Sequence, residues 1–413
     1  HVHGQAPIPL ALMLVAVFVG GMAVFSGVYG WCWFHSRVGR PPIDVMSFVS
    51  IWVLGEWVLT WFLTGFPWLF TGYALLDTPL ASLAPLGGVL LVSFAGLLSG
   101  LFVFEAWKRP PLLLAAAVPW LITWLITDQN WVSPTKQLSV ALVQGNIAQE
   151  TKWQPESAQP ILDRYASLSE SAWENDLVIW PEAAITVPYK GALTYLKGMA
   201  DRTKGALILG VPVLESASDD GYGQRNAAVV VGDGEGRYIK RKLVPFGEFV
   251  PFESVLRGVI TFFNLPMSTT RPGAKQQALP TAIGLNVAIA ICYEVAYPGM
   301  VATDAAAANL IVNISNDTWF GRSIGPMQHM QIARMRALEN GRYLLRATNN
   351  GITAIVAPNG KVVSQLPQFQ QGVLVGQVAA MEGLTPYSRW FDMPIILLSA
   401  FFLAVAVVVR RRN

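Results

Sequence analysis

Charged residues are scarce in this sequence. Of its 413 residues, 13% are charged and 53% are hydrophobic, and the mean hydropathy is +0.42. A soluble globular chain carries roughly a quarter charged residues, so an ordinary soluble enzyme is disfavoured. Intrinsic disorder is excluded, because disordered chains combine low hydrophobicity with high charge. The formal net charge is only +3, and the basic residues are scattered along the chain, which argues against nucleic acid as a partner.

Cysteine is almost as scarce. The two cysteines, Cys32 and Cys292, lie in different parts of the chain, so the sequence has no disulfide framework. Each thiol therefore has to be interpreted from its own surroundings.

The few charges are unevenly distributed along the chain. Residues 1–128 contain nine charged side chains, residues 129–390 contain 42, and residues 391–413 contain four. This distribution predicts a membrane region over 1–128, a soluble domain over 129–390 and a C-terminal membrane helix over 391–413 with a basic tail.

Five apolar stretches are long enough to cross a membrane. A bilayer core of about 30 Å is spanned by roughly 17–25 apolar residues in a helix. The stretches that meet this length are 8–34, 45–63, 86–104, 111–127 and 393–409. Glu56 interrupts the second, and an intramembrane carboxylate is a candidate for function. A transporter would show several such residues, so a hydrogen-bonded structural role is favoured for Glu56.

Basic residues between the spans indicate their orientation, since such residues mark the cytoplasmic side. Arg37 and Arg40 separate the first two spans, Lys108 and Arg109 separate the third and fourth, and arginines 410–412 follow the fifth. All three clusters fall on one side, which places the soluble domain on the other. In a bacterium this predicts an inner-membrane protein with a periplasmic domain. The first residue is then also periplasmic, which implies an odd number of preceding helices if the native N-terminus is cytoplasmic.

The soluble domain has the pattern of an α/β fold. Short β-branched runs predict strands at 137–143, 176–180, 206–214, 227–232, 237–244, 283–292, 309–315, 352–357 and 372–378. Helices are predicted at 155–172, 191–203 and 325–341, the last ending near Gly341. Strands that alternate with helices indicate a layered α/β domain.

Two residues at strand ends are candidates for catalysis. Cys292 ends the apolar run 287–291, where a thiol can lie beside exposed backbone N–H groups. On residue type alone, a buried and inert cysteine is the commoner case. Glu182 follows a strand and comes directly after Trp180 and Pro181. Apolar neighbours raise the pKa of a carboxyl group, which suits a general base.

A basic segment supplies candidate cations. Within 237–243, the alternation of a strand places Lys240 and Lys242 on one face, and their spacing does not choose between them. Glu248 follows in the segment 245–248 and brings a second carboxylate to the same region.

Four motifs in order carry a resemblance to a known family. They are WPE at 180–182, Y-x-K-x-x-L at 238–243, PFGE at 245–248 and ICYE at 291–294. This set resembles the nitrilase, or carbon–nitrogen hydrolase, superfamily, which uses Glu, Lys and Cys in that chain order. Joined to membrane spans, it resembles the apolipoprotein N-acyltransferase family in particular. Further agreeing segments are 63–68, 143–147, 313–321, 333–339, 348–353 and 383–387.

The resemblance implies a fold and a set of site residues. The fold is a nitrilase-like αββα sandwich outside the cytoplasm, attached to a multi-span helical membrane region. Cys292 corresponds to the nucleophile, Glu182 to the general base, and Lys240 rather than Lys242 to the catalytic lysine. The residues implied to support catalysis or bind substrate are Glu248, Tyr293, Glu294, Trp153 and Trp319. His329 lies outside the triad motifs and is interpreted as structural.

The resemblance also implies a reaction. A membrane phospholipid donates a fatty-acyl chain to Cys292 as a thioester. The acceptor is the α-amino group of an N-terminal diacylglyceryl-cysteine on a lipoprotein. We expect no metal and no other cofactor, and a monomeric chain surrounded by membrane lipids.

The sequence departs from the family pattern in two places. The family is expected to have eight spans, whereas five are predicted here. Leu59 stands where an arginine often follows Glu56, so no salt bridge is predicted there. The apolar segment 251–266 is interpreted either as a lid or membrane-dipping loop or as buried core.

Two other functions are weighed. One is a membrane-tethered amidase, in which water takes the acyl group. The other is a transporter or channel with an accessory domain, against which the shortage of intramembrane charge argues.

Overall fold

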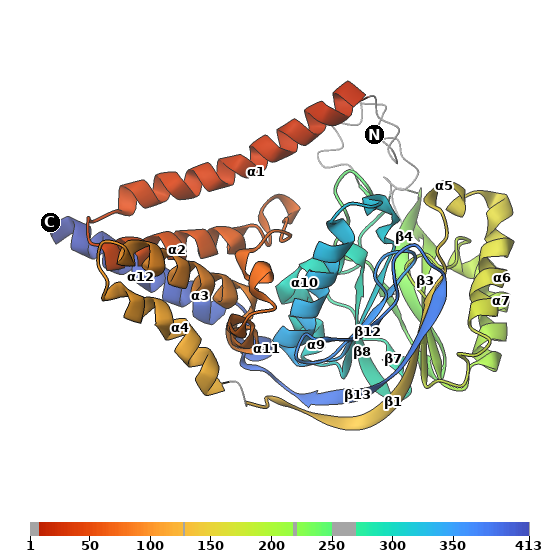
Figure 1. The fold of residues 1–413 in the computed structure, drawn as a ribbon. Coiled ribbons are helices and arrows are strands. Elements are labelled where there is room, and N and C mark those ends of the chain that lie inside the picture. The colour runs from red at the N-terminus through yellow and green to blue at the C-terminus, as the bar shows by residue number, and fades with distance from the viewer. Residues whose placement is uncertain (1–7, 127–128, 218–220, 250–269, 413) are drawn as a thin grey trace. The chain divides into compact units, whose positions relative to one another are not determined.

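The computed structural model describes residues 8–126, 129–217, 221–249 and 270–412 (Figure 1). The chain divides into two compact units, one formed by residues 1–131 and 384–413 and the other by residues 132–383. The segment 251–266, predicted to be a lid or buried core, lies outside the described residues.

The first unit is helical. Its long helices are α1 (Ile8–Ser36), α2 (Pro41–Val58), α3 (Ala84–Ala106), α4 (Leu112–Ile126) and α12 (Met393–Arg412). Short helices are η1 (Phe62–Thr64), η2 (Thr71–Leu75), η3 (Pro79–Leu83) and α11 (Pro386–Trp390). Within the unit, α2 packs against α1, α3 and α12, and α3 packs against α4.

Three of the described helical stretches are long and apolar enough to cross a membrane. They are Ala11–Ser36, Pro79–Ala106 and Met393–Arg412. The other two predicted spans are helical as well, but α2 contains Asp44 and Glu56 and α4 has only 15 residues. Apolar helices that could span a membrane are therefore confirmed, and the crossing by α2 and α4 stays a prediction.

Glu56 has the hydrogen bonds that a structural role requires. Its side chain is buried in α2, and Oε1 accepts from the Thr71 N–H at 2.7 Å and the Thr71 hydroxyl at 2.8 Å. The Trp52 indole N–H donates to the same oxygen at 3.1 Å. The carboxylate thus joins α2 to the start of η2.

The second unit contains two mixed sheets. The six-stranded sheet has the order β13 (Gly372–Gly383), β1 (Val132–Gln144), β2 (Leu177–Ile179), β3 (Ala206–Ala217), β4 (Gly221–Gly232), β6 (Arg237–Ile239). The seven-stranded sheet has the order β12 (Val362–Gln365), β11 (Ala354–Val356), β10 (Leu344–Thr348), β9 (Leu310–Ser315), β8 (Leu285–Ile291), β7 (Thr281–Ala282), β5 (Gly234–Glu235). Every strand predicted from the sequence overlaps one of these.

The two sheets pack face to face between two helical layers (Figure 1). Leu142 and Ile208 of one sheet share a buried core with Ile289 and Val312 of the other. Helices α6 (Ala158–Leu168) and α7 (Tyr189–Arg202) cover the outer face of the first sheet. Helices α9 (Pro298–Ala305) and α10 (Gly325–Asn340) pack on β8 and β10 of the second. The predicted αββα sandwich is confirmed.

Parallel pairing brings the carboxyl ends of strands together. In the second sheet, β8 pairs in parallel with β9 and places Ile291 opposite Ile314. In the first sheet, β2 pairs in parallel with β1 and β3. Loops at the carboxyl ends of parallel strands form sites in such sheets. Cys292, Asn316 and Glu182 all follow strands of this kind.

Candidate active site

Cys292 occupies a sharp turn at the end of β8. It begins the 3₁₀ helix η7 (Cys292–Ala296), and its φ of +53° is in the left-handed region that few residues other than glycine adopt. Such strained backbone is found where the surrounding structure holds a functional residue. Cys292 as a whole residue is half-buried and packs against the core between the sheets.

Glu294 connects this turn by hydrogen bonds to the loop that follows Lys240. Its carboxylate is fully buried and accepts hydrogen bonds from four groups. The donors, at 2.6 to 3.1 Å, are the backbone N–H groups of Ile291, Arg241 and Lys242 and the hydroxyl of Tyr238. Burial raises the pKa of Glu294 to about 7, although the backbone donors oppose the rise. One carboxylate thus fixes the residue before Cys292 and the two residues after Lys240.

Lys240 lies beyond the strand that was expected to contain it. The predicted strand 237–244 ends at Ile239, so the prediction that Lys240 and Lys242 share one face of a strand is wrong. The Lys240 ammonium is buried, 2.8 Å from Glu248 Oε1 and 3.2 Å from Glu182 Oε1. The Lys242 ammonium lies instead over the Tyr297 ring, 4.6 Å from its centroid.

The two carboxylates determine the charge of Lys240. Burial alone would lower the pKa of the lysine, but Glu182 and Glu248 together raise it well above its usual value. Lys240 therefore keeps its positive charge throughout the neutral pH range.

Glu182 is held through both oxygens of its side chain. Oε1 accepts from the Asn226 amide at 2.6 Å, and Oε2 accepts from the Asn316 backbone N–H at 2.8 Å. The Lys152 ammonium, itself buried, donates to the backbone carbonyl of Glu182 at 3.2 Å. Sequence reasoning did not assign these three partners. Asn316 lies inside the agreeing segment 313–321, whereas only the pairing of β4 brings Asn226 to the site.

Glycine is required where β3 approaches the Glu182 turn. A Cβ at Gly210 would lie 2.4 Å from the Ala183 nitrogen and 2.6 Å from the Glu182 Cα. Ala183 has a φ of +47°, so the turn is itself left-handed at this point. The absence of a side chain at Gly210 lets the strand support the backbone that carries the carboxylate.

The other predicted residues lie around this cluster. Tyr293 is buried, and its ring packs edge-on against Tyr297 with centroids 5.3 Å apart. Trp153 and Trp319 are 36% and 46% exposed, so they lie at the surface and their contact with substrate stays a prediction. Among the residues that the structure describes, no group of three or more His, Cys, Asp or Glu is placed to hold a metal ion.

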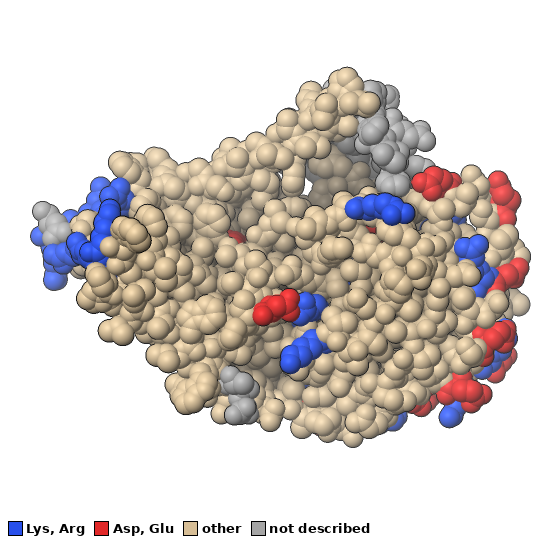
Figure 2. Space-filling model, viewed as in Figure 1, with Lys and Arg blue, Asp and Glu red and all other residues tan. Residues whose placement is uncertain are grey.

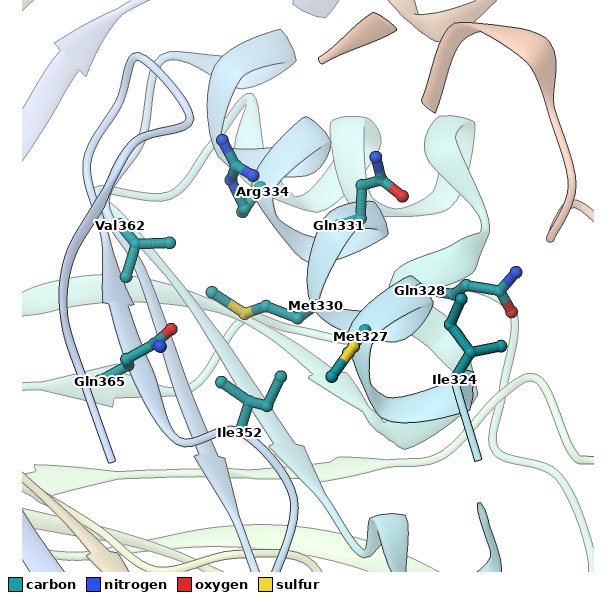
Figure 3. Close-up of a pocket in the computed structure, with 9 residues that line it drawn as sticks. All are labelled: Ile324, Met327, Gln328, Met330, Gln331, Arg334, Ile352, Val362 and Gln365. Carbon is teal, nitrogen blue, oxygen red and sulfur yellow. The ribbon is translucent and has the colours of Figure 1, made fainter. Parts of the chain in front are cut away.

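A hollow of about 280 Å³ lies beside α10, apart from these residues (Figure 3). Its lining includes Met327, Arg334 and Val362, and Figure 3 shows these side chains around the opening. No member of the Glu182–Lys240–Cys292 cluster contributes to it. The hollow is therefore separate from the predicted catalytic residues.

Comparison with known proteins identifies the family. The carbon–nitrogen hydrolase model matches residues 139–387, and the model of the apolipoprotein N-acyltransferase N-terminal domain matches residues 1–102. The chain is 45% identical over 425 residues to an apolipoprotein N-acyltransferase of Pseudomonas paraeruginosa, covering 100% of this chain and 83% of that one. It is 39% identical over 428 residues to one of Photobacterium profundum, covering 99% and 82%.

The chain belongs to the apolipoprotein N-acyltransferase family. The predicted resemblance is thereby confirmed, and the chain is an acyltransferase of lipoprotein biosynthesis and a membrane protein. Among solved structures, it is similar to Nit3 of Saccharomyces cerevisiae, a member of the nitrilase superfamily. That similarity has a TM-score of 0.44 and 19% identity, and covers 69% of this chain and 99% of Nit3.

Burial and a neighbouring carboxylate favour the protonated form of the Cys292 thiol. Burial and the Glu182 carboxylate raise the pKa of Cys292 to about 12, and the Lys240 ammonium opposes them only in part. A thiolate is the nucleophilic form of cysteine. A thiol in this state becomes nucleophilic only when a base removes its proton.

This arrangement predicts how Cys292 responds to pH. An ordinary thiol has a pKa of about 8.5, so its alkylation rate levels off above that pH. The alkylation of Cys292 by iodoacetamide should instead keep rising to the highest pH at which the protein stays folded. Glu182→Gln removes a negative charge that disfavours the thiolate, so the profile should level off at lower pH. Mass spectrometry of the Cys292 peptide measures both rates.

The matched control is Glu170→Gln, which removes an exposed carboxylate paired with Arg202 and should leave the profile unchanged. Identical profiles for the native chain and Glu182→Gln would contradict the electrostatic coupling.

Proposed function

We propose that this chain moves a fatty-acyl group from a membrane phospholipid to the N-terminal diacylglyceryl-cysteine of lipoproteins, through a thioester on Cys292. The observation that carries the proposal is the buried pair of Glu182 and Lys240, 3.2 Å apart, beside a thiol that stays protonated in the resting enzyme. The family supports the lipoprotein acceptor, the apolar helices support a lipid donor, and the thioester is our inference from this geometry.

In the first half-reaction, Glu182 takes the proton of the Cys292 thiol as the sulfur attacks the ester carbonyl of the phospholipid. The carbonyl oxygen becomes an oxyanion, which the Lys240 ammonium and the backbone N–H of Tyr293 stabilise. The intermediate collapses when the ester C–O bond breaks. Glu182 returns the proton to the leaving alkoxide, which departs as a lysophospholipid.

In the second half-reaction, the α-amino group of the lipoprotein attacks the thioester carbonyl. The C–S bond breaks as the C–N bond forms. Glu182 receives a proton from the amine and passes it to the departing Cys292 sulfur, which restores the thiol. The same two donors stabilise the second oxyanion, so one site serves both steps.

Lys240 acts through its charge alone in this scheme. Glu248 and Glu182 keep the lysine protonated, so it does not exchange protons with substrate. Glu248 accordingly holds the ammonium in place, whereas Glu182 transfers the proton of the thiol. Glu182 and Glu248 thus have different roles, although both contact the Lys240 ammonium.

The acyl transfer itself is the test of this function. The full chain in proteoliposomes, given phospholipid and a diacylglyceryl-cysteine peptide, should convert the peptide to its N-acyl form, which mass spectrometry detects. Hydrolysis of soluble amides at a rate comparable to peptide acylation would favour the tethered amidase instead. Solute flux that persists in Cys292→Ala would favour a transporter.

We further propose that the second unit (residues 132–383), which we call the catalytic unit, faces the periplasm and that the chain lies in the bacterial inner membrane. The basis is the position of three basic clusters on one side of the predicted spans. Figure 2 shows Lys and Arg gathered at the end of α12, and arginines 410–412 form its last residues.

This orientation predicts which positions react with a membrane-impermeant maleimide in intact spheroplasts. With Cys32→Ser and Cys292→Ser in the background, Ser133→Cys and Lys190→Cys should be labelled, because both positions are exposed on the catalytic unit. Arg411→Cys should be labelled only after the membrane is permeabilised. Labelling of position 411 with protection of position 133 would reverse the orientation.

A further inference from the structure

His329 is buried directly beneath the nucleophile. It lies on α10, is fully buried, and places Nε2 3.1 Å from the backbone carbonyl oxygen of Cys292. A carbonyl oxygen only accepts hydrogen bonds, so Nε2 carries the proton and donates it. No motif in the sequence marks His329 for a chemical role.

A buried ionic network fixes the other side of the imidazole. Nδ1 lies 3.0 Å from Asp317 Oδ1 and 3.0 Å from a guanidinium nitrogen of Arg346. The same nitrogen of Arg346 donates to Asp317 Oδ2 at 2.7 Å, and the Ser315 hydroxyl donates to Oδ1 at 2.7 Å. Asp317 and Arg346 are almost fully buried, so the network is rigid and shielded from solvent.

Asp317 and Arg346 hold the Nδ1 side of the imidazole, and the Cys292 carbonyl holds the Nε2 side. Burial and the charge of Arg346 lower the pKa of His329, although Asp317 opposes them. Both ring nitrogens are thus engaged away from the thiol, which leaves Glu182 as the base for Cys292.

The bonded carbonyl belongs to the peptide group that also contains the Tyr293 N–H. A trans peptide group is planar, and its C=O and N–H point in opposite directions. Donation to the carbonyl therefore fixes the direction of the N–H on the other side and polarises it. This peptide group follows a residue with φ of +53°, a conformation that requires outside support.

We propose that His329 is a positioning residue of the oxyanion hole. Its hydrogen bond to the Cys292 carbonyl orients and polarises the peptide group, so that the Tyr293 N–H donates to the oxyanion during acyl transfer. The inference rests on the proposed function, because it requires an oxyanion to form at Cys292.

Two reactions of the same sulfur separate this role from a general structural one. Acylation of Cys292 by a p-nitrophenyl ester passes through an oxyanion, whereas alkylation by iodoacetamide displaces iodide from a saturated carbon and forms none. His329→Leu should slow acylation by about 10-fold or more, below the 10²- to 10³-fold cost of deleting an oxyanion donor outright. Alkylation should stay within about twofold, since the thiol and Glu182 are unchanged. His329→Gln keeps an N–H donor and should recover most of the acylation rate.

The matched control is Met330→Leu, a volume-conserving change at the next residue of α10, which is buried and should alter neither rate. Acylation of His329→Leu at the native rate would overturn the inference. So would a loss of the same size in acylation and alkylation, because His329 would then only hold the nucleophile.

A comparison of two amides keeps the test decisive if His329→Leu does not fold. In His329→Gln, the ester should acylate Cys292 faster than in His329→Asn, whose side chain is shorter. Iodoacetamide should alkylate Cys292 at the same rate in both variants. Equal acylation rates in the two variants would overturn the inference. A native Cys292 that the ester does not acylate at all would contradict the proposed thioester chemistry, and the inference with it. The two failures are therefore distinguishable.

Discussion

The full chain, reconstituted with phospholipid and without a lipoprotein acceptor, is expected to accumulate a fatty-acyl thioester on Cys292 and to release lysophospholipid. The physical reason is that direct transfer from ester to amine would require two large lipids at one carbonyl together. A nucleophilic cysteine divides the transfer into two steps, each with one lipid in place. Mass spectrometry should show one added fatty-acyl group on the Cys292 peptide.

The chemistry of the adduct provides its controls. Neutral hydroxylamine and a diacylglyceryl-cysteine peptide should each release the acyl group, and steady-state kinetics should give the parallel lines of a ping-pong reaction. Cys292→Ala should show no adduct and no transfer. Cys32→Ala should behave as the native chain, because Cys32 lies on α1 in the other unit. An unmodified Cys292, together with kinetics that require both lipids bound at once, would contradict the mechanism.

Glu182→Gln and Lys240→Met are each expected to lower the rate of acyl transfer by at least roughly 10²-fold, as the loss of an acid–base group or an oxyanion donor does. Glutamine cannot take the thiol proton, and methionine fills the space of lysine without its charge. The measurement is the single-turnover rate of Cys292 acylation by phospholipid, which isolates the first half-reaction from release of product.

Lys242→Met is the matched control for the lysine. Its ammonium contacts the Tyr297 ring, whereas that of Lys240 contacts Glu182 and Glu248. The loss of rate should therefore be far smaller at position 242. Equal losses at positions 240 and 242 would show that the positive charge of the whole segment matters and not one placed ammonium.

The long helices of the first unit could be predicted closely from sequence alone. The length of an apolar stretch and its lack of charge are local properties of the sequence. A long helix that is apolar on all sides is unfavourable in water and therefore indicates a membrane span. The same holds for the strands of the catalytic unit, because near-continuous apolar runs form only where both faces of a sheet are covered. The end of α10 before Gly341, which has a φ of +61°, also followed from a local signal.

The charge pattern of the site could not be predicted in the same way. Alternation along 237–244 treated Lys240 and Lys242 as equivalent, but the strand ends at Ile239 and the two side chains then diverge. The family motifs selected Lys240, and only the tertiary structure gives the reason, which is its contact with two buried carboxylates. Strand ends are set by pairing with neighbours, which a single sequence does not display.

By itself, the sequence determined the division into apolar helices and an α/β unit, the αββα class and, through its ordered motifs, the candidates Glu182, Lys240 and Cys292. The tertiary structure alone decided what surrounds them. Asn226 reaches Glu182 from β4, and His329 reaches the Cys292 carbonyl from α10, across separations of 44 and 37 residues. Hydrogen bonds of this kind depend on sheet register and helix packing, which are properties of the whole fold. Motifs select the candidate groups, whereas long-range packing sets the hydrogen bonds and charges around them.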